Sequence, residues 1–250
     1  YLVEGTTDRP PLPDSAFGNR TALRLLPFGS PASHAIFEYA EELGQRRRVE
    51  PKGDLVTQLI LSEVDGKGLS KSEFRNFFHL LVFAGNETTR TAISHGALAL
   101  AEHPGEWHCL TKNPSVVGSA TEEILRWATP VLHMRRTATK DTELAGTAIA
   151  AGDKVVMWYA SANRDDRTFE EPNEFRVSRD PNQHFAFGGG GVHFCLGAHL
   201  ARLEIRILLE EMLRRGLGLV KGDEPARIPS NFVHGIESLY LGIEQSRSET

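Results

Sequence analysis

Hydrophobic residues recur at helical spacing in the first half of the chain. Apolar positions fit one helix over residues 32–48, and Asp54 is placed to cap a second helix that runs through Leu61. Prolines and glycines interrupt the first thirty residues, which predicts irregular structure there. Regular structure is therefore expected to begin near residue 32.

Two further helices are predicted from their start signals. Ser70 and Glu73 form a capping box, and no proline follows for about thirty residues, so one long helix of roughly 45 Å is expected. Its apolar residues crowd more than one face, as in a helix that runs through a core. A shorter helix is predicted from Ser119, with Glu122 completing a second capping box and Pro130 ending it.

The pattern then changes from helical to alternating. Residues 137–149 alternate with a period near two, and a turn at 151–153 leads into an apolar stretch at 154–160, which predicts a small antiparallel sheet. A long coil over 163–191 precedes a helix over 198–215 and a short β-like tail. The expected fold class is mainly α with small antiparallel β-sheets.

Composition narrows the class of protein. The 250 residues carry a net charge of −5 with both signs interspersed, so the chain lacks the basic stretch that nucleic-acid binding requires. No run reaches the ~20 apolar residues that cross a bilayer, and the first residues lack a signal-peptide pattern. We expect a cytoplasmic enzyme with no nucleic-acid partner and no membrane span.

The two cysteines, Cys109 and Cys195, are too few for a disulfide framework. Cys109 has no glycine around it and is expected to be a buried structural residue. Cys195 follows a run of four glycines, just before a predicted helix, where a helix N-terminus and backbone N–H groups stabilise a thiolate. Three alternatives remain: a phosphate-binding loop, a zinc site and a buried structural cysteine. The sequence lacks the usual phosphate-loop fingerprint and lacks further zinc ligands at the usual spacing.

The stretch from Phe187 to Gly197, FGGGGVHFCLG, resembles the haem-binding signature of the cytochromes P-450, Phe-Gly-x-Gly-x-His-x-Cys-x-Gly. It contains one glycine more than the common form, and this variant resembles the actinobacterial enzymes that oxidise sterol side chains and methyl-branched lipids. The resemblance implies a bacterial, soluble-type P-450 fold over a single domain, residues 1–250. It also implies haem b (iron protoporphyrin IX) with Cys195 as the axial iron ligand. Other loop residues expected to contact the haem are Phe187, Gly189, His193 and Gly197.

Residues 84–89, Ala-Gly-Asn-Glu-Thr-Thr, resemble the oxygen-activation motif of the same family and lie in the predicted long helix. Ala84 and Gly85 would leave room beside the haem, and Glu87 and Thr88 are the expected catalytic pair that relays protons. Without the resemblance, the alternative interpretation is a buried helix that tolerates Gly85 and carries Glu87 on its surface.

Three charged residues resemble the family's structural triad. Glu123 and Arg126 match its Glu-x-x-Arg pair, and Arg179 ends a segment that resembles the family's coil before the cysteine loop. Without the resemblance such a pair is common on exposed helices and contributes roughly 0.2–0.5 kcal/mol. Arg136 matches the family's position for a haem propionate partner, and Arg135 is the alternative; both are otherwise solvated arginines before a sheet.

An apolar substrate is expected from the residues that would line the distal pocket, with His133 and His234 as polar exceptions. The apolar candidates are Leu80, Phe83, Val131, Leu132, Met134, Phe232 and Val233.

The helix that follows Cys195 carries four arginines that would attract an acidic ferredoxin, or would instead pair with glutamates of the same helix. They are Arg202, Arg206, Arg214 and Arg215.

These features imply a haem-dependent monooxygenase that hydroxylates an aliphatic C–H bond of a bulky hydrophobic substrate, such as a sterol or branched lipid. The two electrons would come from a ferredoxin and ferredoxin reductase, because the chain has no dinucleotide fingerprint and no iron–sulfur cysteines. The alternatives are a non-catalytic haem-binding fragment or carrier, and a relative that rearranges oxygenated lipids; the Glu87-Thr88 pair favours the enzyme. The resemblance covers about residues 32–242, so the N-terminal third of the fold is expected to be absent.

Overall fold

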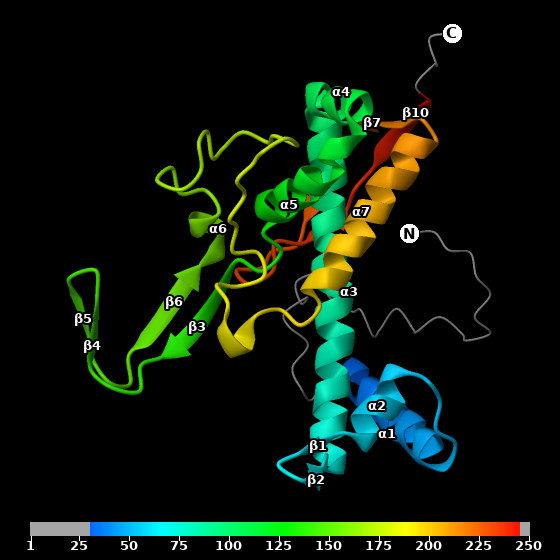
Figure 1. The fold of residues 1–250 in the computed structure, drawn as a ribbon, viewed down its shortest axis with the longest axis vertical. Helices are drawn as coiled ribbons and strands as arrows, with labels where there is room; N and C mark the ends of the chain where they lie inside the picture. Colours follow the sequence, from blue (N-terminus) through cyan, green and yellow to red (C-terminus); the bar gives the residue numbers. More distant parts are fainter. Residues whose placement is uncertain (1–30, 246–250) are drawn as a thin grey trace. The chain divides into compact units, whose positions relative to one another are not determined.

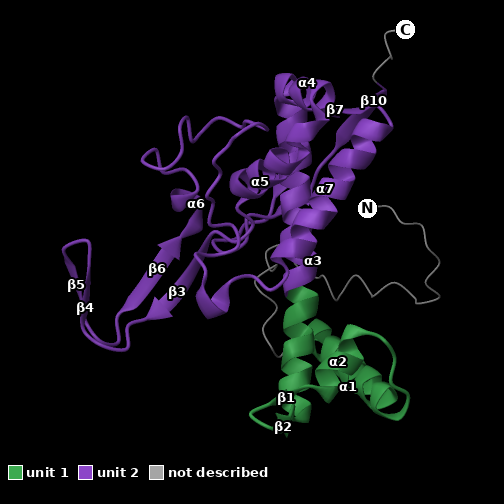
Figure 2. Ribbon diagram, in the orientation of Figure 1, with its two compact units in different colours: residues 1–83 green, residues 84–250 purple. Residues whose placement is uncertain are grey.

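The computed structural model describes residues 31–245, drawn in colour in Figure 1. The expected irregular segment, residues 1–30, lies outside the described residues. The chain divides into two compact units, residues 1–83 and 84–250 (Figure 2), and helix α3, Lys71–Glu102, contributes to both. Within the described ranges, none of the helices has the length and apolar character needed to cross a membrane.

The first unit consists of α1 (Pro31–Val49), α2 (Leu55–Leu61), a hairpin of β1 (Glu63–Val64) and β2 (Lys67–Gly68), and the first turns of α3. Both predicted helices are confirmed within two residues at their ends. Asp54 caps α2, because its Oδ1 accepts a hydrogen bond from the Thr57 N–H at 2.9 Å. Ala40, Ile60 and Phe74 form the buried core of this unit.

The capping box that begins α3 is confirmed. The backbone N–H of Glu73 donates to Ser70 Oγ at 3.2 Å, and the Glu73 carboxylate accepts from the Ser70 N–H at 2.8 Å. The helix that follows has 32 residues, as the uninterrupted pattern predicted.

The second unit packs helices around one hydrophobic core. Besides the rest of α3 it contains α4 (Pro104–Lys112), α5 (Val117–Ala128), α6 (Tyr159–Ala162) and α7 (Ala198–Arg214), with short 3₁₀ turns η2 (Pro114–Val116) and η3 (Gly191–His193). Core residues come from α3, α4, α5, α7 and the long coil, and include Leu100, Leu110, Ile124, Phe175 and Leu209. Helix α4 was not predicted, although Pro104 at its start is a helix-start signal.

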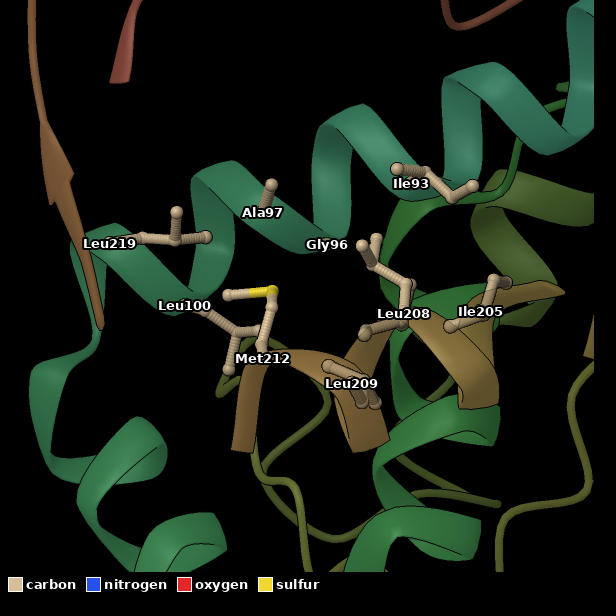
Figure 3. Close-up of a pocket in the computed structure, with 10 residues that line it drawn as sticks. Ile93, Gly96, Ala97, Leu100, Ile205, Leu208, Leu209, Met212 and Leu219 are labelled. Atoms are coloured by element: carbon tan, nitrogen blue, oxygen red, sulfur yellow. The ribbon is translucent and has the colours of Figure 1, made fainter. Parts of the chain in front are cut away.

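The contact between α3 and α5 depends on one glycine. A Cβ on Gly96 would lie 2.7 Å from Cγ2 of Ile124, so only glycine fits here without a shift of the neighbouring side chain. A residual cavity of about 10 Å³ lies between α3, α5, α7 and β7, lined by apolar side chains (Figure 3). That volume is at the lower limit for a single water, so the centre of this core is closely packed.

The helix α5 begins at Val117, two residues before the expected start, and the predicted capping box is wrong. The Ser119 hydroxyl donates to the carbonyls of Val116 at 2.9 Å and Val177 at 2.7 Å, and the Glu122 carboxylate binds side chains from distant segments instead. The helix ends at Ala128, and Thr129 follows in the left-handed region at φ +39°.

The β structure consists of separate two-stranded antiparallel sheets. The pairs are β3 (His133–Thr137) with β6 (Lys154–Trp158), β4 (Thr142–Leu144) with β5 (Thr147–Ile149), β7 (Leu217–Lys221) with β10 (Leu241–Gln245), and β8 (Ala226–Arg227) with β9 (Ile236–Ser238). The expected alternating stretch 137–149 therefore contains its own hairpin, because Ala145 and Gly146 turn the chain at φ +50° and +79°.

Candidate functional site

Cys195 lies three residues before the start of α7, in the loop that follows the long coil. Its backbone N–H donates to the Phe187 carbonyl at 3.1 Å, which closes the loop, and its thiol is free and exposed. A buried structural role for Cys195 is therefore wrong. By contrast Cys109 is partly buried and packs against the core of the second unit.

The glycine run is explained by its backbone conformation. Gly188, Gly190 and Gly191 have φ values of +87°, +96° and +75°, a region that other residues adopt only with strain. The chain can thus make two changes of direction between Phe187 and Cys195 and still return close enough for their hydrogen bond.

Residues beside the cysteine form an exposed apolar surface. Val192 is 98% exposed and Leu196 is 79% exposed, and Phe194 also reaches solvent. Side chains of this kind are normally covered, so a flat apolar group beside the thiol fits these residues, and a thiolate is a suitable ligand for its iron. Among residues 31–245 no group of three or more His, Cys, Asp and Glu side chains could hold a metal ion, so the zinc alternative has no ligand set there.

The two expected propionate partners are exposed. Arg136 lies on β3, where its Nη1 donates to the Arg135 carbonyl at 3.1 Å, and His193 lies in η3. Neither side chain forms an ion pair with any described residue, so both retain hydrogen-bonding capacity for an anionic group.

The expected proton-relay residues lie side by side in α3 but do not bond to each other. The Thr88 hydroxyl donates to the Ala84 carbonyl at 2.7 Å, and both carboxylate oxygens of Glu87 lie 2.8 Å from Nη2 of Arg90. A Cβ placed on Gly85 would meet no atom within 4 Å, so the helix surface is open there.

The structure brings Glu123, Arg126 and Arg179 together in the interior. Arg126 donates from Nε and Nη2 to both Glu123 oxygens at 2.7 and 2.8 Å, and Arg179 Nε lies 3.1 Å from Glu123 Oε2. The side chains of Glu123 and Arg126 are fully buried, so these charges depend on one another.

The two arginines also bind the coil that leads to the cysteine loop. Arg126 Nη1 donates to the carbonyls of Asn163 and Pro172, both at 2.8 Å, and Arg179 Nη2 donates to the carbonyl of Glu174 at 2.9 Å. Because these carbonyls belong to a segment without regular structure, the guanidinium groups supply the partners that a helix or sheet would otherwise provide.

Several of the predicted substrate-pocket residues are neighbours. Val131 pairs with Val233 in a β-bridge, and the Leu132 N–H donates to the Phe232 carbonyl at 2.9 Å. The adjacent Met134 lies on β3. The remaining two, Leu80 and Phe83, belong to α3 within the first unit.

The two histidines expected to be polar pocket residues differ in their surroundings. The His133 ring packs against Trp158 and Phe232, with centroid distances of 4.6 and 5.8 Å. His234 instead stacks on His95 of α3 at 4.1 Å, and its Nδ1 lies 2.6 Å from the Ala128 carbonyl. This histidine pair had no sequence signal, because its members are 139 residues apart.

The arginines of α7 and of its C-terminal cap are all paired with acids. Arg206 pairs with Glu210, and Arg214 and Arg215 both pair with Glu211, as the alternative to ferredoxin docking predicted. Arg202 is different, because its partner is Glu122 of α5.

Comparison with known proteins agrees with this geometry. The family model "Cytochrome P450", written here P-450, matches residues 32–237. The methyl-branched lipid omega-hydroxylase of Mycobacterium tuberculosis is 52% identical over 207 residues, which cover 82% of this chain and 48% of that protein. The steroid C26-monooxygenase of Rhodococcus jostii is 45% identical over 210 residues, which cover 84% of this chain and 44% of that protein.

Solved structures agree as well. A Mycobacterium marinum cytochrome P-450 in complex with pseudoionone has a TM-score of 0.79 and 45% identity, covering 83% of this chain and 50% of that one. The chain spans about half the length of the curated relatives it matches. With its cysteine loop, mainly helical fold and family match over most of its length, the chain belongs to the cytochrome P-450 family.

Proposed function

We propose that this chain is the haem-binding part of a monooxygenase that hydroxylates an aliphatic C–H bond of a bulky apolar substrate. The observation that carries the proposal is the exposed Cys195 thiol, held by a closed glycine loop beside an uncovered apolar surface. Residues 1–250 would belong to one cytochrome P-450 domain, and a cytoplasmic location stays a prediction.

Haem b would be held by Cys195 as the iron ligand, with Arg136 and His193 as partners of its propionates. Phe187, Gly189 and Gly197 of the loop, and Ala84 and Gly85 of α3, would contact it. When bound, the haem supplies dioxygen activation, which a thiolate ligand favours by donating electron density in this family.

The protein residues would control the thiolate and the protons. Cys195 would supply the thiolate from the loop just before the N-terminus of α7, where its sulfur is exposed. Thr88 would hold a proton on its hydroxyl, and Glu87, fixed by Arg90 and 22% exposed, would exchange protons with solvent.

The triad of Glu123, Arg126 and Arg179 would take no direct part in the reaction. Its guanidinium groups bind the coil that presents the cysteine loop, so we assign it a structural role.

Sterol side chains and methyl-branched lipids are the substrate classes we propose. The support is the apolar character of the neighbouring Val131, Leu132, Phe232 and Val233, together with the names of the two curated relatives at 52% and 45% identity. We include Leu80, Phe83 and Met134 as further pocket residues. A ferredoxin and ferredoxin reductase are the proposed electron donors.

Turnover tests this function directly. The haem-loaded chain, mixed with ferredoxin, its reductase and a panel of sterols and branched lipids, should give a hydroxylated product detectable by mass spectrometry. Haem binding without any product would instead support a haem-binding fragment or carrier. Product that forms only from charged small molecules would refute the proposed substrate class.

A further inference from the structure

A second charged cluster connects three separate segments next to the cysteine loop. Glu122 of α5 accepts hydrogen bonds from Arg202 of α7, with Nε to Oε1 at 2.7 Å and Nη2 to Oε2 at 2.9 Å. It also contacts Nε2 of His184, in the coil before the loop, at 3.0 Å. Because Nδ1 of His184 accepts from the Ala186 N–H at 3.2 Å, Nε2 is the nitrogen that donates to the carboxylate.

The cluster is well fixed. The His184 side chain is only 2% exposed, and Arg202 binds Glu122 through two parallel hydrogen bonds, a strong and directional arrangement. Burial opposes ionisation of Glu122, but the hydrogen bonds from His184 and Arg202 outweigh it and lower the pKa of this carboxyl to about 2. The carboxylate is therefore charged at neutral pH.

The cluster reaches Cys195 through one aromatic ring. The guanidinium carbon of Arg202 lies 4.5 Å from the centroid of the Phe187 ring, a cation–π contact, and the His184 ring lies 6.0 Å from the same ring. The carbonyl of Phe187 accepts the N–H of Cys195 at 3.1 Å. Between these two residues the backbone is rich in glycine, so the loop has little stiffness of its own.

We propose that Glu122, His184 and Arg202 form a positioning cluster that fixes Phe187, and through its carbonyl fixes the Cys195 thiolate. The proposal rests on the proposed function, since it assigns Cys195 as the iron ligand. Arg202, whose side chain is 33% exposed, is then a positioning residue that binds Glu122, whereas the sequence suggested either a docking charge for ferredoxin or a pair within its own helix.

The most informative variant is Arg202→Lys in the haem-loaded chain. Lysine keeps the positive charge but loses the two-pronged contact with Glu122 and the flat surface that stacks on Phe187. Arg206→Lys is the matched control, because it makes the same change one turn along the same helix, where the arginine pairs with the exposed Glu210.

The readout is the Soret band of the reduced, carbon monoxide-bound protein, which reports whether a thiolate ligates the iron. In Arg202→Lys the thiolate-type band should disappear about tenfold faster than in the parent, equivalent to about 1.4 kcal/mol of lost anchoring. Arg206→Lys should behave as the parent does, and the two variants should have equal thermal unfolding midpoints by circular dichroism. The double variant Glu122→Gln/Arg202→Lys should lose the thiolate-type band little faster than Arg202→Lys alone, since both changes break the same contact.

Each other outcome has a defined meaning. A stable thiolate-type band in Arg202→Lys would overturn the positioning role. So would a loss of the band that is accompanied by a lower thermal unfolding midpoint, because general destabilisation would then explain it. If the parent itself gave no thiolate-type band, the proposed function would fail first, and the cluster would have no ligand to position.

Discussion

The stacked pair of His95 and His234 should make the stability of the protein depend on pH. His95 is 4% exposed, and its Nε2 lies 2.8 Å from the His234 carbonyl, which can only accept, so the neutral ring donates there. Burial, and then the nearby His234, lower the pKa of His95 to about 4. Arg227 and Arg164 act in the same direction.

The magnitude follows from the difference between the folded and unfolded chain. Unfolded His95 titrates near 6.5 and folded His95 near about 4, which at 1.36 kcal/mol per pKa unit corresponds to roughly 3 kcal/mol. Because the folded pKa is lowered, this stability is present above pH 6.5. It is lost progressively as the pH falls from 6.5 to about 4, where the unfolded chain binds the proton and the folded chain does not.

Urea unfolding followed by tryptophan fluorescence, repeated across this pH range, measures the effect. As the pH falls through this range, the free energy of unfolding of the parent should decrease by roughly 3 kcal/mol more than that of His95→Gln. Glutamine keeps an amide donor but cannot be protonated. His108→Gln removes an exposed histidine and is the matched control, expected to follow the parent. Equal pH dependence in the parent and His95→Gln would show that His95 is not the group whose protonation destabilises the fold.

Three further changes test other parts of the protein. Glu123→Gln leaves Arg126 buried without its counter-charge and should lower the free energy of unfolding by about 3–5 kcal/mol; a change below about 1 kcal/mol in urea unfolding would show that the pair is not essential. Gly96→Ala forces a Cβ against Ile124 and should cost about 1–3 kcal/mol in the same assay, whereas an unchanged midpoint would mean that the helices separate freely. Thr88→Ala should keep haem binding but release more peroxide per electron consumed, and an unchanged ratio of product to reductant would remove Thr88 from the proton relay.

Local signals in the sequence predicted the long helix and the cysteine loop. The capping box at Ser70 and Glu73 involves partners three residues apart, so the sequence alone determines the contact. The loop is similar, because Gly188 and Gly190 occupy backbone conformations that few other residues adopt.

The same kind of signal failed at α5 for a physical reason. Ser119 and Glu122 have the spacing of a capping box, but Ser119 donates to Val177, 58 residues away, and Glu122 binds Arg202, 80 residues away. A bidentate arginine–carboxylate contact is stronger than the hydrogen bond of a local helix cap. Tertiary packing therefore decides which contact these side chains make. The sequence offered ferredoxin docking or a pair within its own helix for Arg202, and it missed Glu122 because that partner is 80 residues away.

The proposed function depends on Cys195 as the iron ligand of a bound haem. The most direct measurement is the Soret spectrum of the reduced, carbon monoxide-bound protein for the parent, Cys195→Ala and Cys109→Ala. We expect a thiolate-type band in the parent and in Cys109→Ala, since Cys109 packs against the core, and no such band in Cys195→Ala. A normal thiolate-type band in Cys195→Ala would show that another group ligates the iron.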